Sequence, residues 1–463
     1  MFSEEPARKR QGEFRVKRLA FAYHPRSFAT MDVKAAADGV CDLVWIVDHD
    51  LGETSSMVPL LRRLGDVVDV TGLGHDAAAA RIAEARPDGI LALHDQLLSW
   101  TAEVAQRLGL PGFSPETAAA LSDKRAQRAA LAAGGVPMPA VLPVPPRRDR
   151  ESLSALLGAA TFPAVMKPRR SDCSRNTVLV RSRAELVAAL DDVARHAPAD
   201  RDALQLEEYL GDRPGAATEG DDVADYVSVE SVVVAGRPRH LAVTGRFPPA
   251  APLRETGMFI PAAMPADERR AALDLATAAL QALGVERGCL HTEVKMTPDG
   301  PRVIEVNGRI GGGVPEMLRD VAGVELLPMA LRGALDVQED VAPLPPTTGV
   351  GYLFFRQLPR EHRRVVSIDG LDELRARPGV SQVVLNFGPG SEIDWRLGTD
   401  ECVFTVEGVA ADHEALLAMR RAVEHDVVVV GEAVQDAPRK ASRAGEDDGD
   451  ADDLDGRDAL SAA

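Results

Sequence analysis

Two strand-like runs joined by a turn, over residues 289–309, constrain the fold of this chain more than any other stretch. They read CLHTEVKMTPDGPRVIEVNGR, and Pro298-Asp299-Gly300 is a strong turn signal between them. With a three-residue loop at this turn, counting back along both strands places Glu293 opposite Glu305. The sequence therefore predicts a β-hairpin in which two carboxylates face each other.

Facing carboxylates repel unless a cation lies between them, so this hairpin predicts a charged site. Asn307 points to the same side as Glu305, because side chains alternate along a strand. Two carboxylates and an amide oxygen are hard ligands, suited to Mg²⁺ that bridges substrate phosphates. The planar guanidinium of Arg309 can donate two parallel hydrogen bonds to an anion, and Gly311–Gly313 let backbone N–H groups approach the same anion. The alternative is an exposed strand face with salt bridges, followed by a glycine-rich turn.

Composition limits the class of protein. The 463 residues are 45% hydrophobic but only 4% aromatic, which suits a soluble α/β protein of two to four domains. The formal net charge of −18 argues against nucleic-acid binding and against anionic membrane surfaces. No run approaches twenty apolar residues, and the charged N-terminus lacks an apolar signal core. The four widely spaced cysteines predict reduced thiols, and hence a cytoplasmic protein with no zinc site.

The pattern along the chain predicts an N-terminal α/β domain over residues 16–110. Short apolar runs such as CDLVWIV and DGILAL alternate there with helical stretches, which is typical of a small parallel sheet. The stretch 110–140 predicts a turn and one helix, and 183–196 and 266–284 predict two more. Strand-like runs after residue 348 predict a further α+β section over 346–435. Residues 1–15 and the acidic segment 436–463 are predicted to be disordered.

Six ordered blocks of sequence resemble the ATP-grasp superfamily, within it the L-amino-acid ligase branch of carboxylate–amine ligases. They are LPGFSPETAAALSDKRAQRAAL, FPAVMKP, LQLEEYLGD, YVSVE, GCLHTEVK and VIEVNGRIGGG, over roughly 110–340. The resemblance continues into residues 349–393. It implies an α/β (α+β) ATP-grasp fold with an N-terminal pre-ATP-grasp domain. An ATP-grasp domain would span 111–345, followed by a C-terminal ligase-type domain.

The resemblance also implies roles for individual residues. Lys124 and Lys167 match the lysines that hold nucleotide phosphates, although a lysine is usually only a solvated surface residue. Glu293, Glu305 and Asn307 match the magnesium ligands, for two Mg²⁺ ions with Mn²⁺ as an alternative. The positions that match the rest of the nucleotide site are Ser174, Glu207, Glu208, Tyr209, Leu210, Asp225 and Glu230.

On the substrate side, Arg309 matches the arginine that orients the substrate carboxylate and steadies an acyl phosphate, near Gly311, Gly312 and Gly313. Glu255 is a candidate to receive the ammonium of an amino acid, and a solvated loop glutamate is the equal alternative. We expect Gly313 to leave room for a bulky acyl group. The flap over the phosphates, PRRSDCSRNTV at 168–178, departs from the family because it contains no glycine.

These roles imply an ADP-forming ligase that activates a carboxylate as an acyl phosphate and joins it to an amine. The product would be a dipeptide or a related amide, from small-molecule substrates with ATP as co-substrate. A carboxylase or formate-using synthetase of the same fold is the second interpretation, and a nucleotide-binding module without catalysis is the third. The resemblance also allows a homodimer, for which the residue pattern itself gives no evidence.

Overall fold

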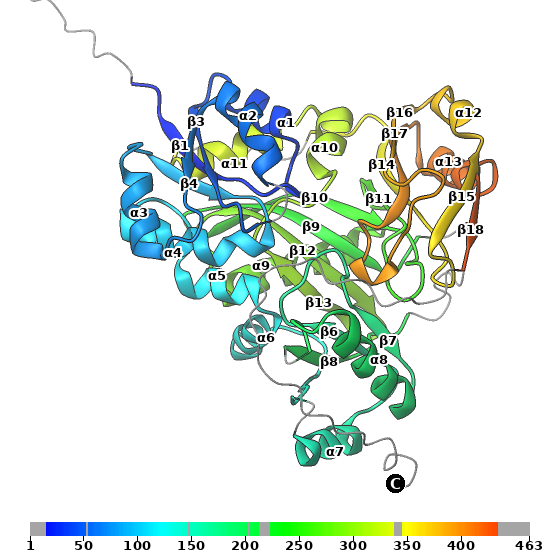
Figure 1. Cartoon of the computed structure of the whole chain (residues 1–463). Helices are drawn as coiled ribbons and strands as arrows, with labels where there is room; N and C mark the ends of the chain where they lie inside the picture. Colours follow the sequence, from blue (N-terminus) through cyan, green and yellow to red (C-terminus); the bar gives the residue numbers. More distant parts are fainter. Residues whose placement is uncertain are drawn as a thin grey trace, which may run out of the picture.

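The computed structural model describes residues 15–51, 54–146, 149–201, 203–212, 223–337 and 345–433. The predicted disorder at 1–15 and 436–463 therefore falls almost entirely outside the described residues. Figure 1 shows three regions around a central sheet: the N-terminal part, a small lower lobe that carries β6 and β8, and the C-terminal part.

The N-terminal part is a small parallel sheet, as the sequence predicts, and its four strands lie in the order β3-β2-β1-β4. Its apolar strands are covered by helices on both faces, which is why the runs carry little alternation. Its elements are β1 (Arg18–Ala22), α1 (Thr30–Ala37), β2 (Asp42–Val47), α2 (Thr54–Leu64), β3 (Asp66–Asp69), α3 (His75–Ala83), β4 (Gly89–Ala92), the 3₁₀ turn η1 (Asp95–Leu97) and α4 (Leu98–Leu108).

The single helix predicted within 110–140 is wrong, because the structure has two helices, α5 (Pro115–Ser122) and α6 (Lys124–Ala133). Asp123 separates them with extended dihedrals (φ −125°, ψ 110°), and its side chain accepts hydrogen bonds from the N–H groups of Arg125 and Ala126. An aspartate that caps a helix in this way ends the preceding one. The break places Lys124 at the first position of α6.

The lower lobe is a four-stranded antiparallel sheet in the order β5-β8-β6-β7. Its core is formed by apolar side chains of β6, β8 and α8, among them Met166, Leu186 and Leu206. The predicted helix 183–196 is confirmed as α8. The elements of the lobe are β5 (Val141–Pro143), α7 (Arg150–Ala159), β6 (Ala164–Pro168), β7 (Val178–Val180), α8 (Arg183–His196) and β8 (Leu204–Glu208).

An eight-stranded sheet in the order β13-β12-β9-β10-β11-β14-β17-β16 joins the middle of the chain to its C-terminal part. The C-terminal strands β14, β17 and β16 thus extend the central sheet, and β15 and β18 pair separately. The elements are β9 (Tyr226–Val234), β10 (Arg237–Arg246), β11 (Gly257–Ile260), α9 (Ala266–Ala282), β12 (Gly288–Thr297), β13 (Gly300–Asn307), α10 (Val314–Ala322), α11 (Leu326–Ala334), β14 (Val350–Gln357), β15 (Arg364–Asp369), α12 (Leu371–Arg375), β16 (Val380–Leu385), η2 (Trp395–Leu397), β17 (Cys402–Ala410), α13 (His413–His425) and β18 (Val428–Glu432). Among the described residues, no helix is long and apolar enough to cross a membrane.

Candidate active site

A cavity of about 600 Å³ collects residues from all three regions of the fold. Nearly every residue singled out from the sequence lines it; the exception is Glu230, which lies behind the cavity wall. The predicted residues that line it are Lys124, Lys167, Ser174, Glu207, Glu208, Tyr209, Leu210, Asp225, Glu255, Glu293, Glu305, Asn307, Arg309, Gly311, Gly312 and Gly313.

The hairpin of β12 and β13 supplies the acidic wall, and Glu293 lies directly opposite Glu305 as predicted. The predicted three-residue loop is wrong, since Thr297 pairs with Gly300 across a tighter turn. A β-bulge at Ile304 adds back the residue that the shorter turn removes. The two differences cancel, so the carboxylates still face each other.

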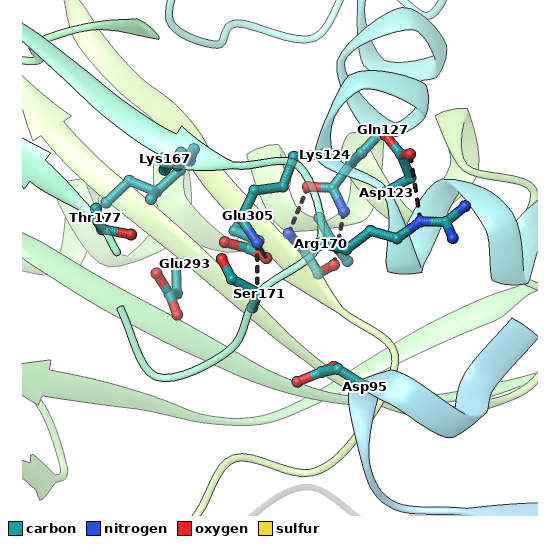
Figure 2. A network of polar contacts seen from close by, with 12 residues as sticks. Asp95, Asp123, Lys124, Gln127, Lys167, Arg170, Ser171, Thr177, Glu293 and Glu305 are labelled. Atoms are coloured by element: carbon teal, nitrogen blue, oxygen red, sulfur yellow. Dashed lines mark hydrogen bonds and ion pairs between the residues drawn. The ribbon is translucent and has the colours of Figure 1, made fainter. Parts of the chain in front are cut away.

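Lys124 reaches this wall from the start of α6 (Figure 2). Its Nζ lies 2.8 Å from Oε1 of Glu305 and donates to the carbonyl of Ser171 at 2.7 Å. The lysine is only 7% exposed. Asp123 fixes this arrangement by capping α6 and by accepting from Nη2 of Arg169 at 2.6 Å. Lys124 therefore joins the hairpin to the first residues of the flap.

Lys167, at the end of β6, belongs to a buried ionic network. Its Nζ lies 2.8 Å from Oε2 of Glu207, and the Nε of Arg128 donates to Oε1 of the same carboxylate at 2.9 Å. Burial alone would raise the pKa of Glu207, but Lys167 and Arg128 outweigh it and lower the pKa to about 2. The network fixes Glu207, the first residue of the segment Glu207–Leu210 that the sequence places in the nucleotide site. The next residue, Glu208, donates its N–H to the carbonyl of Ala140 at 2.8 Å.

The glycine-free flap has left-handed backbone at three positions, with φ of +48° at Cys173, +60° at Ser174 and +52° at Asn176. Non-glycine side chains thus occupy conformations that glycine adopts at lower cost. The flap is attached to the C-terminal part, since Thr399 N–H donates to the Cys173 carbonyl and Asn176 N–H donates to the Arg396 carbonyl, both at 2.8 Å.

Arg309 lies beside the N-terminal part, and its Nε donates to Oδ2 of Asp95 at 2.8 Å. The three glycines that follow differ in their surroundings. A Cβ on Gly313 would lie 2.5 Å from Leu353, and its φ is +74°. A Cβ on Gly312 would meet nothing within 4 Å. The expectation of free room at Gly313 is therefore wrong, and the open position is Gly312.

Arg246 is a cavity residue that the sequence reasoning missed, and its side chain is almost completely buried. Its Nη1 donates to Oε1 of Glu255 at 2.8 Å, and its Nη2 lies 3.0 Å from Nε2 of His291. The other ring nitrogen of His291 lies 2.9 Å from Oε2 of Glu230. Glu230 is thus linked to the cavity through His291, and also through Ser228, which donates to Glu230 and accepts from Arg246. Glu255 already has a cationic partner. Arginine ending a strand is too common a signal to have identified Arg246.

The hairpin residues fit a hard divalent cation by donor chemistry. Glu293, Glu305 and Asn307 present oxygens to one cavity beside two lysines. Within the described ranges, no three His, Cys, Asp or Glu side chains gather as a metal site. Two carboxylates and one amide leave coordination positions for oxygens of a bound substrate, which is the usual arrangement for Mg²⁺ at phosphates.

Comparison with known proteins agrees with this geometry. Residues 160–316 match the family model described as an ATP-grasp domain. Carnosine synthase 1 from Gallus gallus is 31% identical over 266 residues, which cover 54% of this chain and 27% of that protein. The uncharacterized protein y4rH from Sinorhizobium fredii is 27% identical over 311 residues, covering 66% of this chain and 60% of that protein. The chain thus spans less than two thirds of the length of these curated relatives.

Among solved structures, that of L-amino acid ligase from Bacillus licheniformis superimposes with a TM-score of 0.71 at 20% sequence identity. The superposition covers 90% of this chain and 99% of that one. The three-part architecture is therefore shared over almost the whole length of both chains. The chain therefore contains an ATP-grasp domain, matched over residues 160–316, and shares its overall fold with the L-amino acid ligase structure.

Proposed function

We propose that the protein is an ATP-dependent carboxylate–amine ligase. It activates a carboxylate, most simply that of an amino acid, as an acyl phosphate and joins it to an amine with release of ADP and phosphate. One observation carries the proposal: the facing pair Glu293 and Glu305 lies in the same cavity as Lys124, Lys167, Arg309 and a glycine loop. The names of two similar proteins, carnosine synthase 1 and L-amino acid ligase, support it.

Different residues of the cavity would bind the phosphates, the metal ion and the adenine. Lys124 and Lys167 offset negative charge on the transferring phosphoryl group. Glu293, Glu305 and Asn307 would hold Mg²⁺, which when bound supplies charge neutralisation between the phosphate oxygens. In this proposal the strand end Glu207–Leu210 receives the adenine through its backbone. Lys124 contacts both Glu305 and the flap carbonyl of Ser171. When a phosphate binds to Lys124, these two contacts would be replaced by contacts to phosphate oxygens.

Arg309 and the backbone at Gly311–Gly313 hold the substrate carboxylate and then the acyl phosphate. The Asp95 carboxylate fixes the Nε of Arg309, so its guanidinium plane is oriented before substrate arrives. An amine then attacks the acyl carbon, and phosphate leaves. No covalent bond to the protein forms in this sequence of steps.

A test is phosphate release from ATP and Mg²⁺ with a panel of amino acids, supplied singly and in pairs, with the product masses recorded. We expect release that depends on amino acids, and a product lighter by one water than the sum of the pair. Release without any such product, or release that depends on bicarbonate or formate, would contradict the proposal.

A further inference from the structure

Two acidic side chains of the cavity each have one carboxylate oxygen that the roles proposed so far do not use. Asp172 lies in the flap and Asp95 begins η1, after β4 of the N-terminal part. Both line the cavity. The side chain of Asp172 is 5% exposed and that of Asp95 is 15% exposed. Two carboxylates from distant segments therefore lie in the wall of one substrate cavity.

Each of these carboxylates has one oxygen that accepts no hydrogen bond from the described residues. Oδ2 of Asp95 accepts from Arg309 and Oδ2 of Asp172 lies 3.4 Å from Nε2 of His94. Oδ1 of Asp95 and Oδ1 of Asp172 are buried and have no hydrogen-bond partner among the described residues. Leaving a buried carboxylate oxygen without a donor is costly, so a donor from a ligand is expected there.

Neither Arg26 nor His94 donates a hydrogen bond to Oδ1 of Asp172. Nη2 of Arg26 lies 3.8 Å from Oδ1 of Asp172, beyond hydrogen-bond distance, and it is bonded instead to Asp400. His94 accepts from the Gln96 N–H through Nδ1 and stacks on His24 at 3.5 Å. Burial and the neighbouring His24 ring lower the pKa of His94 to about 4, so the imidazole is neutral at pH 7. Asp172 is thus an ionised acceptor beside a neutral ring.

Hydrogen bonds to both neighbouring residues hold Asp172 in place in the cavity wall. The carbonyl before it, on Ser171, accepts from Lys124, which is also paired with Glu305. The carbonyl after it, on Cys173, accepts from the Thr399 N–H. Figure 2 shows Ser171 and Glu305 close together, with Asp95 nearby on the side of the N-terminal part. Asp172 is therefore held from both sides, and it follows Ser171, whose carbonyl binds the predicted phosphate-binding lysine Lys124.

From these contacts we infer that Asp172 and Asp95 form the subsite of the amine substrate, which they bind as an ammonium group. An ammonium has three donors and a positive charge, and so can satisfy both free oxygens at once. It would lie beside Arg309, next to the carboxylate under activation. Before the C–N bond forms, the ammonium would give one proton to one of the two carboxylates, and the neutral amine would then attack the acyl carbon as phosphate leaves. The inference rests on the proposed ligase function and adds the charge state in which the second substrate binds.

The test compares two small nucleophiles in the full-length protein. Ammonium chloride supplies a charged amine, and hydroxylamine is neutral at slightly alkaline pH but still traps an acyl phosphate as a hydroxamate. In Asp172→Asn we expect the KM for ammonium in amide formation to rise about 100-fold, as for loss of a charged hydrogen bond. Hydroxamate formation should stay within about threefold of the wild-type rate. Asp172→Glu should recover part of the ammonium affinity.

A matched control is Asp200→Asn. Asp200 pairs with Arg175 and Asn176 of the flap but does not line the cavity, so its loss perturbs the flap alone. We expect this variant to change both reactions in the same proportion. If Asp172→Asn behaves likewise, or keeps the wild-type KM for ammonium, the subsite is refuted while the ligase stands. If the wild-type protein forms no hydroxamate with any carboxylate of the panel, the proposed function fails, and the subsite with it.

Discussion

Replacing Glu207 by glutamine should destabilise the lower lobe, because this carboxylate is 4% exposed and is shared by two cations. Arg128 donates to both of its oxygens, at 2.9 and 3.2 Å, and Lys167 lies 2.8 Å from Oε2. A glutamine keeps the shape but turns one oxygen into a donor that faces a cation. Lowering the pKa from 4.5 to about 2 corresponds to about 3 kcal/mol of stabilisation.

The pH dependence of this contribution has a definite sign. The folded pKa of Glu207 is depressed, so the stabilisation is fully present above pH 4.5 and is lost as the pH falls toward 2. Hydrogen exchange of the β8 amides, followed by mass spectrometry at neutral pH, measures local opening in a protein of several regions. We expect exchange in Glu207→Gln to be about 100-fold faster.

Glu208→Gln is the matched control for this prediction. Glu208 follows on the same strand and pairs with Arg302, but its side chain is 40% exposed, so its loss should cost less than about 1 kcal/mol. Equal exchange rates in the two variants would refute the reasoning that the buried network stabilises β8.

Three further predictions concern the same cavity. Asp123→Ala should cost about 1 kcal/mol of stability, measured by thermal unfolding, because α6 loses its cap. It should also weaken ATP binding, measured by calorimetry, because Lys124 is no longer held beside Glu305. Unchanged ATP affinity would contradict the role of Asp123 in positioning Lys124. Gly313→Ala should lower the unfolding temperature, because this residue has a positive φ and an added Cβ would meet Leu353. Gly312→Ala should fold normally and raise only the KM for the carboxylate substrate. Equal thermal stability of the two variants would contradict this account of the loop. Glu305→Gln should abolish ADP formation with an unchanged circular dichroism spectrum, and full activity of that variant would remove the hairpin from the site.

The sequence predicts much of this fold because several local signals agree with the tertiary structure. The helix 183–196 is bounded by Ser182, whose side chain caps it, and carries buried leucines at Leu186 and Leu190. The parallel N-terminal sheet follows from its short apolar runs. The facing pair of Glu293 and Glu305 could be found because a strong turn signal fixes the register to within one residue.

Other features could not be read from local pattern. The bulge at Ile304 falls between Val303 and Glu305, where two apolar β-branched residues give no sign of an irregular pairing. The pairing of Arg309 with Asp95 joins residues 214 positions apart, and no periodicity relates them. The extension of the central sheet by β14 and β17 likewise depends on strand order, which composition does not encode. The missed contacts are therefore those that only the tertiary fold creates.

The central claim is that the protein activates a carboxylate by phosphorylation, and transfer of oxygen tests it most directly. The substrate would carry ¹⁸O in its carboxylate, with ATP, Mg²⁺ and the amine substrate present, and the released phosphate would be weighed by mass spectrometry. The account predicts one ¹⁸O atom in each phosphate released during amide formation, because the bridging oxygen of the acyl phosphate leaves with phosphorus. Phosphate without label, formed at the same rate as the amide, would contradict it.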